Sequence, residues 1–125
     1  MDQTENPDLR QSFLALAELM RRLRDPVSGC PWDVAQTYET IAPYTIEEAY
    51  EVADAIGRKD VTHLREELGD LLFQVFFHSR IAEESGHFTL EEVVTGLVDK
   101  MTRRHPHVFG DQPRHSAEDQ PANWE

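Results

Sequence analysis

Five acidic residues in the middle of this 125-residue sequence have the chemical type and the spacing of a metal site. Glu47, Glu48 and Glu51 come first, and Glu67 and Asp70 follow after an interval of fifteen residues. Residues three apart on a helix lie on nearly the same face, so the acids three apart in each group can converge on one ion. Two such helices packed antiparallel would bring four carboxylates together. Like charges that close repel each other strongly unless cations lie between them.

These acids also lie beside apolar residues and not on a solvated face. On a helical wheel, at about 100° per residue, Glu48 falls between Val52 and Ala55, and Glu67 lies beside Leu71. An unpaired buried carboxylate is costly, so we expect a cation to compensate this charge. In the alternative interpretation, Thr45 and Glu48 form a capping box and the other acids lie on the surface. That alternative does not explain the matching spacing on two neighbouring helices.

Ligand chemistry indicates which metal these acids would bind. All five offer hard oxygen donors, which favour Mg²⁺ or Mn²⁺. A di-iron site in a helical bundle uses Glu-x-x-His on two helices, and that spacing, from Glu84 to His87, is here interrupted by Gly86. A single cysteine and the lack of paired histidines at ligand spacing disfavour zinc.

Four stretches with helical periodicity are predicted to position these residues. They cover Pro7 to Arg24, about Thr45 to Gly57, about Val61 to Ser85, and Thr89 to Pro106. We expect Asp60 to cap the third helix and Gly86 to end it. The stretch Asp25–Tyr44 contains three prolines and is predicted to be a long, functional loop. Because no β-type alternation competes with this pattern, we predict an all-α, four-helix-bundle-like domain.

The predicted domain spans residues 1–110, and residues 111–125 form a polar tail that we expect to be loosely ordered. Within the third helix, the run Leu71–Phe77 is apolar nearly all round, so it must be buried on all sides. A partner subunit is the simplest cover, which predicts a homo-oligomer built on two-fold dimers. In the alternative, the first and fourth helices cover this run alone.

Composition limits the partners of the chain. The formal net charge is −12, from 24 acidic against 12 basic residues, which disfavours a nucleic acid polymer but not a small phosphorylated substrate. No apolar run approaches the roughly 20 residues needed to cross a membrane. The acidic start Met1–Glu5 does not look like a signal or transit peptide, and the single cysteine fits a reducing compartment. We therefore predict a cytoplasmic location.

The acids and their flanks resemble the MazG-type nucleoside triphosphate pyrophosphohydrolases. The resemblance covers about Leu14 to Gly110 and is similar to the first domain of relatives that carry two in tandem and continue beyond Glu125. Besides the two acid groups, it rests on the segments Gly29–Asp33, Gln36–Thr37, Glu67–Val75 and Arg103–Phe109.

The resemblance implies an all-α fold that oligomerises through its bundle and binds Mg²⁺. The implied metal ligands are Glu48, Glu51, Glu67 and Asp70. Glu47 joins Glu48 as a catalytic candidate, either binding another ion or orienting the attacking water. The implied reaction is attack of water on the α-phosphorus of a nucleoside triphosphate, with pyrophosphate leaving.

Two further groups of side chains are candidates for substrate binding. Lys100 and Arg103, at the basic end of the fourth helix, would bind phosphate, or would simply complement the helix dipole, as would Arg104. Trp32 would stack on a base, with Asp33 or Gln36 offered to the base edge, or would anchor its loop to the bundle.

Two other functions remain open on the sequence alone. One is a non-catalytic interaction module that binds a protein through its acidic surface, and the other is a sensor that binds nucleoside triphosphates without cutting them. The module predicts no metal-dependent activity. The sensor uses the same ligands as the enzyme and is separated from it only by assay.

Overall fold

A computed structural model describes residues 7–114, and those residues form helices and turns without any strand. The helices are α1 (Pro7–Leu23), α2 (Pro31–Val34), α3 (Tyr38–Gly57), α4 (Val61–Ser85), α5 (Leu90–Arg104) and α6 (Pro106–Phe109). The all-α prediction is therefore confirmed. The described chain forms two compact units that divide between Thr89 and Leu90, so that α1–α4 belong to the first and α5 and α6 to the second.

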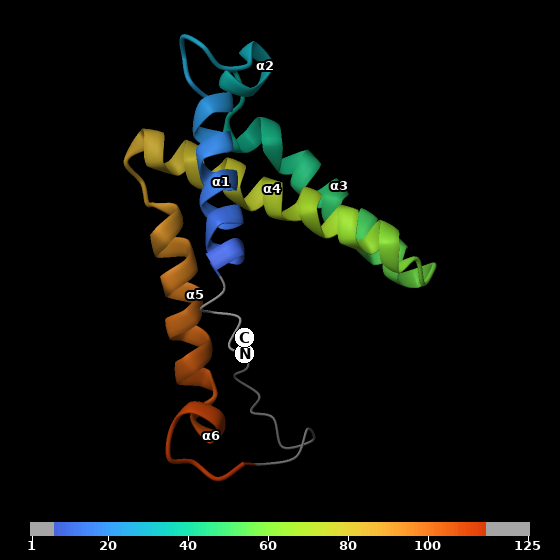
Figure 1. The fold of residues 1–125 in the computed structure, drawn as a ribbon, viewed down its shortest axis with the longest axis vertical. Coiled ribbons are helices and arrows are strands. Elements are labelled where there is room, and N and C mark those ends of the chain that lie inside the picture. Colours follow the sequence, from blue (N-terminus) through green and yellow to red (C-terminus); the bar gives the residue numbers. More distant parts are fainter. Residues whose placement is uncertain (1–6, 115–125) are drawn as a thin grey trace. The chain divides into compact units, whose positions relative to one another are not determined.

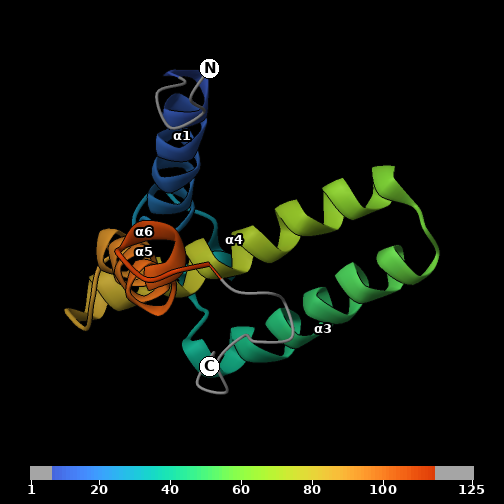
Figure 2. The same ribbon diagram turned by 90° about the horizontal axis from the view of Figure 1, so that it is seen from below.

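In the first unit, α3 and α4 run antiparallel along each other as a helical hairpin, and α1 crosses α4 (Figures 1 and 2). The turn of the hairpin is short, with Lys59 in the left-handed region at φ 58°. Asp60 is the N-cap of α4, as predicted, and accepts a hydrogen bond from the His63 backbone N–H at 3.0 Å. Gly86 ends α4 in the left-handed conformation at φ 72°, also as predicted.

The second predicted helix begins seven residues earlier than expected. Its N-cap is Thr37, which forms a capping box with Thr40, so the capping box of Thr45 and Glu48 in the alternative interpretation is wrong. Pro43 lies inside α3, where the absence of its N–H leaves one backbone acceptor without its usual helical donor. The predicted loop is correspondingly shorter, and it contains the one-turn helix α2.

The core of the first unit lies where α1 crosses the hairpin. Phe77 and Met20 are each 1% exposed, and Ile41 is 2% exposed. Phe13 packs edge-on against Phe76 with ring centroids 5.1 Å apart, which ties α1 to α4. These contacts fix α4 against α1 and α3 at one end of the hairpin.

The apolar run of α4 is covered on one side only. Phe76 and Phe77 are buried, whereas Leu68, Leu72 and Val75 remain between 41% and 49% exposed. The three exposed residues follow one another at spacings of four and three, so they form a stripe along a single face of α4. No helix in the described part of the chain is long and apolar enough to cross a membrane.

Candidate functional site

A carboxylate cluster lies between α3 and α4, in the half of the hairpin nearer its turn. One carboxylate oxygen from each of Glu48, Glu67 and Asp70 lies within 4.8 Å of the others. Glu51 also lies within hydrogen-bond range of Glu67. The antiparallel packing of the hairpin therefore brings together acids that are about twenty residues apart in the sequence.

Glu67 lies deepest in this carboxylate cluster, with only 7% of the residue exposed. Burial, together with the carboxylates of Asp70 and Glu51, raises the pKa of Glu67 to about 6. The His63 ring faces it, with Nε2 3.5 Å from Glu67 Oε2. Since the Arg58 guanidinium donates to His63 Nδ1 at 2.8 Å, a neutral His63 carries its proton on Nε2 and directs it at Glu67.

Glu48 shows the strongest sign of a missing partner. Its Oε2 is sealed from water and has no hydrogen-bond partner among the described residues. Burial, then the charges of Asp70, Glu47 and Glu51, raise the pKa of the Glu48 carboxyl. An oxygen left this way costs free energy unless a cation binds it.

The donor set fits a hard divalent cation. The oxygens of the cluster come from carboxylates alone, and a Mg²⁺ ion would compensate the negative charge that they bring together. Glu47 is exposed at the edge of the cluster, close enough for its charge to act on Glu48. The residues present thus fit Mg²⁺ or Mn²⁺, with Glu47 beside the candidate ligands.

A neutral polar group continues the seam between α3 and α4 one turn away from the acids. Thr45 Oγ1 lies 3.0 Å from Gln74 Oε1 and 2.9 Å from His78 Nε2. Burial lowers the pKa of His78, so this ring is neutral near pH 7. Sequence reasoning missed this role of Thr45 because it took the residue for a helix cap. Spacing could have indicated this role. Thr45 precedes Glu48 by three residues and Gln74 follows Asp70 by four, so both lie on the helix faces that carry the acids.

Trp32 lies on α2 and packs edge-on against Tyr44 of α3, with ring centroids 5.9 Å apart. Both rings are about half exposed, at 52% and 46%. Tyr44 precedes Glu48 by four residues, so it lies on the same face of α3 about 6 Å along the helix axis. An exposed aromatic pair therefore stands one helical turn from the carboxylate cluster.

The other two predicted residues of this loop are held by their own segment. Gln36 Nε2 donates to the Trp32 carbonyl oxygen at 2.8 Å, so its amide group supports the turn below Trp32. The Asp33 side chain is half-buried, and its backbone carbonyl accepts a hydrogen bond from Arg24. Cys30 is a partly buried free thiol that lines a cavity of about 540 Å³ beside α1, and none of the five acids lines that cavity.

Lys100 and Arg103 lie in the second unit, on α5. Arg103 Nε donates to Asp99 Oδ2 at 3.0 Å, and both side chains are well exposed, so this pair contributes little stability. Replacing Asp99 by another anion as the partner of the Arg103 guanidinium therefore costs little free energy. The phosphate-binding role of both residues stays a prediction.

Comparisons with known proteins identify the family. The family model of the MazG nucleotide pyrophosphohydrolase domain matches residues 36–109, which include the carboxylate cluster, the aromatic residue Tyr44 and all of α3–α6. The chain belongs to the MazG family. That membership confirms the resemblance on which the acid groups were interpreted, and it agrees with the all-α fold.

Two curated proteins that resemble this chain support the assignment. The chain is 54% identical over 110 residues to the nucleoside triphosphate pyrophosphohydrolase of Escherichia coli K12, covering 88% of this chain and 42% of that protein. It is 52% identical over 104 residues to the nucleoside triphosphate pyrophosphohydrolase/pyrophosphatase MazG of Thermotoga maritima, covering 83% and 40% respectively. The chain thus spans well under half the length of these curated relatives.

A solved structure shows the same MazG fold. A crystal structure of a MazG-related protein from Thermotoga maritima superposes with a TM-score of 0.69 at 29% sequence identity. The match covers 88% of this chain and 90% of that chain. At this level of similarity, the helical arrangement of the MazG domain is shared.

Proposed function

We propose that this MazG domain hydrolyses nucleoside triphosphates to nucleoside monophosphate and pyrophosphate with the help of Mg²⁺. The observation that carries the proposal is the carboxylate cluster, above all the sealed and unpartnered Oε2 of Glu48. Two relatives at more than 50% identity, named for this activity, support the choice of substrate. The proposed metal ligands are Glu48, Glu51, Glu67 and Asp70, with Mn²⁺ as a substitute.

The chain supplies groups for each part of the reaction. Bound Mg²⁺ would lower the pKa of a water and neutralise charge on the phosphate oxygens. Glu47, exposed beside Glu48, accepts the proton of the attacking water and orients its oxygen toward the α-phosphorus. A bond forms between that oxygen and the α-phosphorus, and the bond to the bridging oxygen of the β-phosphate breaks. Pyrophosphate then leaves with the electron pair.

Side chains outside the cluster bind the rest of the substrate. Trp32, which packs edge-on against Tyr44, stacks on the base. Asp33 is half-buried and follows Trp32 directly in the chain, and it binds the edge of that base. Gln36 acts through the Trp32 carbonyl, which it holds. Lys100 and Arg103 bind phosphate oxygens that the metal leaves uncompensated.

The domain is proposed to act as a homo-oligomer, because the exposed stripe of Leu68, Leu72 and Val75 needs cover. We also propose that residues 1–110 make up the functional domain, that 111–125 are a tail, and that the protein works in the cytoplasm, where its substrates are found. Residues 115–125 of that tail lie outside the described residues. The net charge of −12 disfavours nucleic acid polymers as partners.

The decisive assay incubates the purified chain with a panel of ribo- and deoxyribonucleoside triphosphates, with Mg²⁺ and with EDTA, and separates the products by ion exchange. We expect monophosphate and pyrophosphate, lost with EDTA and in Glu51→Gln. Diphosphate plus phosphate would overturn the proposed bond. Metal-dependent binding without turnover would indicate a nucleotide sensor, and the absence of both would favour an interaction module.

A further inference from the structure

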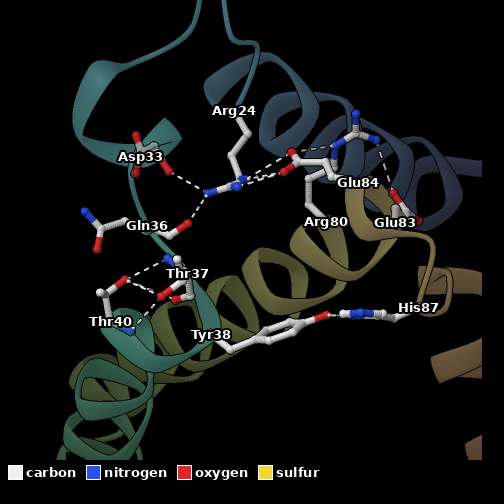
Figure 3. Close-up of polar contacts among 10 residues, drawn as sticks. All are labelled: Arg24, Asp33, Gln36, Thr37, Tyr38, Thr40, Arg80, Glu83, Glu84 and His87. Atoms are coloured by element: carbon white, nitrogen blue, oxygen red, sulfur yellow. Dashed lines mark hydrogen bonds and ion pairs between the residues drawn. The ribbon is translucent and has the colours of Figure 1, made fainter.

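Arg24 is a side chain of the first unit with several hydrogen bonds that the proposed chemistry does not use. It follows the last residue of α1, and its side chain is only 8% exposed. Its guanidinium carbon lies 5.5 Å from the centroid of the Phe77 ring, one of the most buried side chains of the core. Figure 3 shows it between the loop that carries Asp33 and Gln36 and the end of α4 that carries Glu84.

Each nitrogen of this guanidinium donates to at least one acceptor. Nε and Nη2 bond the Glu84 carboxylate, at 3.0 Å and 2.7 Å. Nη1 donates to the carbonyl oxygens of Asp33 at 2.6 Å and of Gln36 at 3.0 Å. The planar guanidinium reaches the carboxylate and both carbonyls at once, and a lysine ammonium would lose either the carboxylate or the carbonyls.

These bonds add to the few other contacts that hold this segment, such as the Cys30 N–H to the Leu23 carbonyl oxygen at 2.9 Å. Helix α2 has four residues, none of them buried, and its N-cap, Cys30, makes no side-chain cap. Arg24 donates to the carbonyl oxygens of Asp33, near the end of α2, and of Gln36, just beyond it. The Gln36 side chain in turn donates to the Trp32 carbonyl oxygen. Arg24 therefore fixes the position of Trp32 through the backbone of its own segment.

We propose that Arg24, held by Glu84, is a positioning residue for nucleotide binding, which acts by keeping Trp32 against Tyr44 at one helical turn from the carboxylate cluster. The inference rests on the proposed function. It concerns affinity for the nucleoside part of the substrate, because Arg24 touches neither the cluster nor any reacting atom. The metal site and the chemical step are left unchanged when the contact is lost.

The first test compares Arg24→Lys with Arg21→Lys, a matched control whose partner Glu18 forms an exposed pair. We expect Arg24→Lys to raise KM by roughly tenfold, as expected for loss of charge-assisted hydrogen bonds, with kcat and the Mg²⁺ dependence within about twofold of the wild type. Arg21→Lys should leave KM and kcat as they are. A loss confined to kcat would overturn the proposal.

A double-mutant cycle with Trp32→Ala tests whether Arg24 acts through Trp32. If it does, Arg24→Lys raises KM in the wild type but adds almost nothing in the Trp32→Ala background. An equal rise in both backgrounds would show a general structural role and refute the proposal. Failure of the wild type to hydrolyse any nucleotide would count against the proposed function, and the cycle would then be run on nucleotide binding.

A readout independent of activity uses fluorescence in a Trp124→Phe background, where Trp32 is the only tryptophan. Arg24→Lys and the milder Glu84→Gln should both increase quenching of Trp32 by acrylamide, because the ring leaves Tyr44. Glu84→Gln keeps the two carbonyl bonds of Arg24 and serves if Arg24→Lys is too unstable to assay. Unchanged quenching in both variants would rule out the proposed positioning.

Discussion

At the scale of single residues, the pKa of Glu67 makes the proposed metal site depend on pH. Burial and the neighbouring carboxylates raise its pKa to about 6, above the value of 4.5 for a free glutamate. The metal-free fold therefore gains stability from this group below pH 4.5 and loses it as the pH rises through about 6. Mg²⁺ would bind the ionised form of Glu67. The affinity of the site for Mg²⁺ should therefore rise as the pH rises through about 6.

We predict that the stabilisation of the chain by MgCl₂, measured as a shift in Tm, is large at pH 7.5 and nearly absent at pH 5. In Glu67→Gln the side chain cannot ionise. Without metal, the Tm of this variant should therefore lack the fall between pH 4.5 and 6 that ionisation of Glu67 causes in the wild type. Its Tm should also not rise with MgCl₂ at any pH. A Mg²⁺ shift that persists at pH 5 would contradict the assignment of Glu67 as a ligand.

The proposed ligand Glu51 gives a prediction on catalysis. Glu51→Gln removes one negative charge but keeps the side-chain shape, and we expect it to lower kcat/KM at least about a hundredfold, the upper end of losses seen for groups that only support a ligand. Glu39→Gln, on the first turn of α3, is the control and should retain activity. Steady-state hydrolysis at several Mg²⁺ concentrations measures both. Recovery of Glu51→Gln to wild-type rate at high Mg²⁺ would indicate a supporting role.

At the scale of elements, the loop before α3 depends on one glycine. A Cβ at Gly29 would lie within 2.5 Å of the Asp25 carbonyl oxygen, and backbone cannot move away as a side chain would. We predict that Gly29→Ala destabilises the fold by about 1–3 kcal/mol, a typical cost of overpacking. Gly57→Ala, where a Cβ meets nothing within 4 Å, should change stability by less than about 0.5 kcal/mol. Urea denaturation of both variants measures the difference.

The elements also show what could be predicted from the sequence. The ends of α4 follow from Asp60 and Gly86, because a cap residue and a left-handed glycine act locally. The start of α3 could not be found this way. Pro43 argues against a helix through it, and the real cap, Thr37 with Thr40, lacks the usual acidic partner. Buried contacts around Ile41 override that local preference.

The residues of the candidate site also differ in whether the sequence predicts them. The acids could be found because helical spacing is a local property, and because their flanks resemble a known family. Thr45, Gln74 and Arg24 were missed, since their bonds join residues far apart in the chain, such as Arg24 and Glu84. Such contacts depend on how helices cross, which spacing within one helix does not encode.

At the scale of the whole molecule, the exposed stripe of α4 predicts self-association. Leu72→Asp places a charge in the centre of that stripe and should convert the oligomer to a monomer, because burying an unpaired carboxylate is costly. Val61→Asp, an equally apolar and 76% exposed position at the start of α4, is the control and should leave the assembly intact. Light scattering after size exclusion gives the mass. A monomeric wild type would refute the prediction.

Because Tyr44 and Glu48 are four residues apart on one helix, α3 fixes the distance between them. A helix rises about 1.5 Å per residue and does not stretch, so the distance between the aromatic pair and the carboxylates is fixed at about one turn. Under the proposed function, this fixed distance separates the stacked base from the phosphorus that reacts. A single alanine inserted between Tyr44 and Glu48 would rotate one end by about 100° and leave ring and metal site each intact but out of phase.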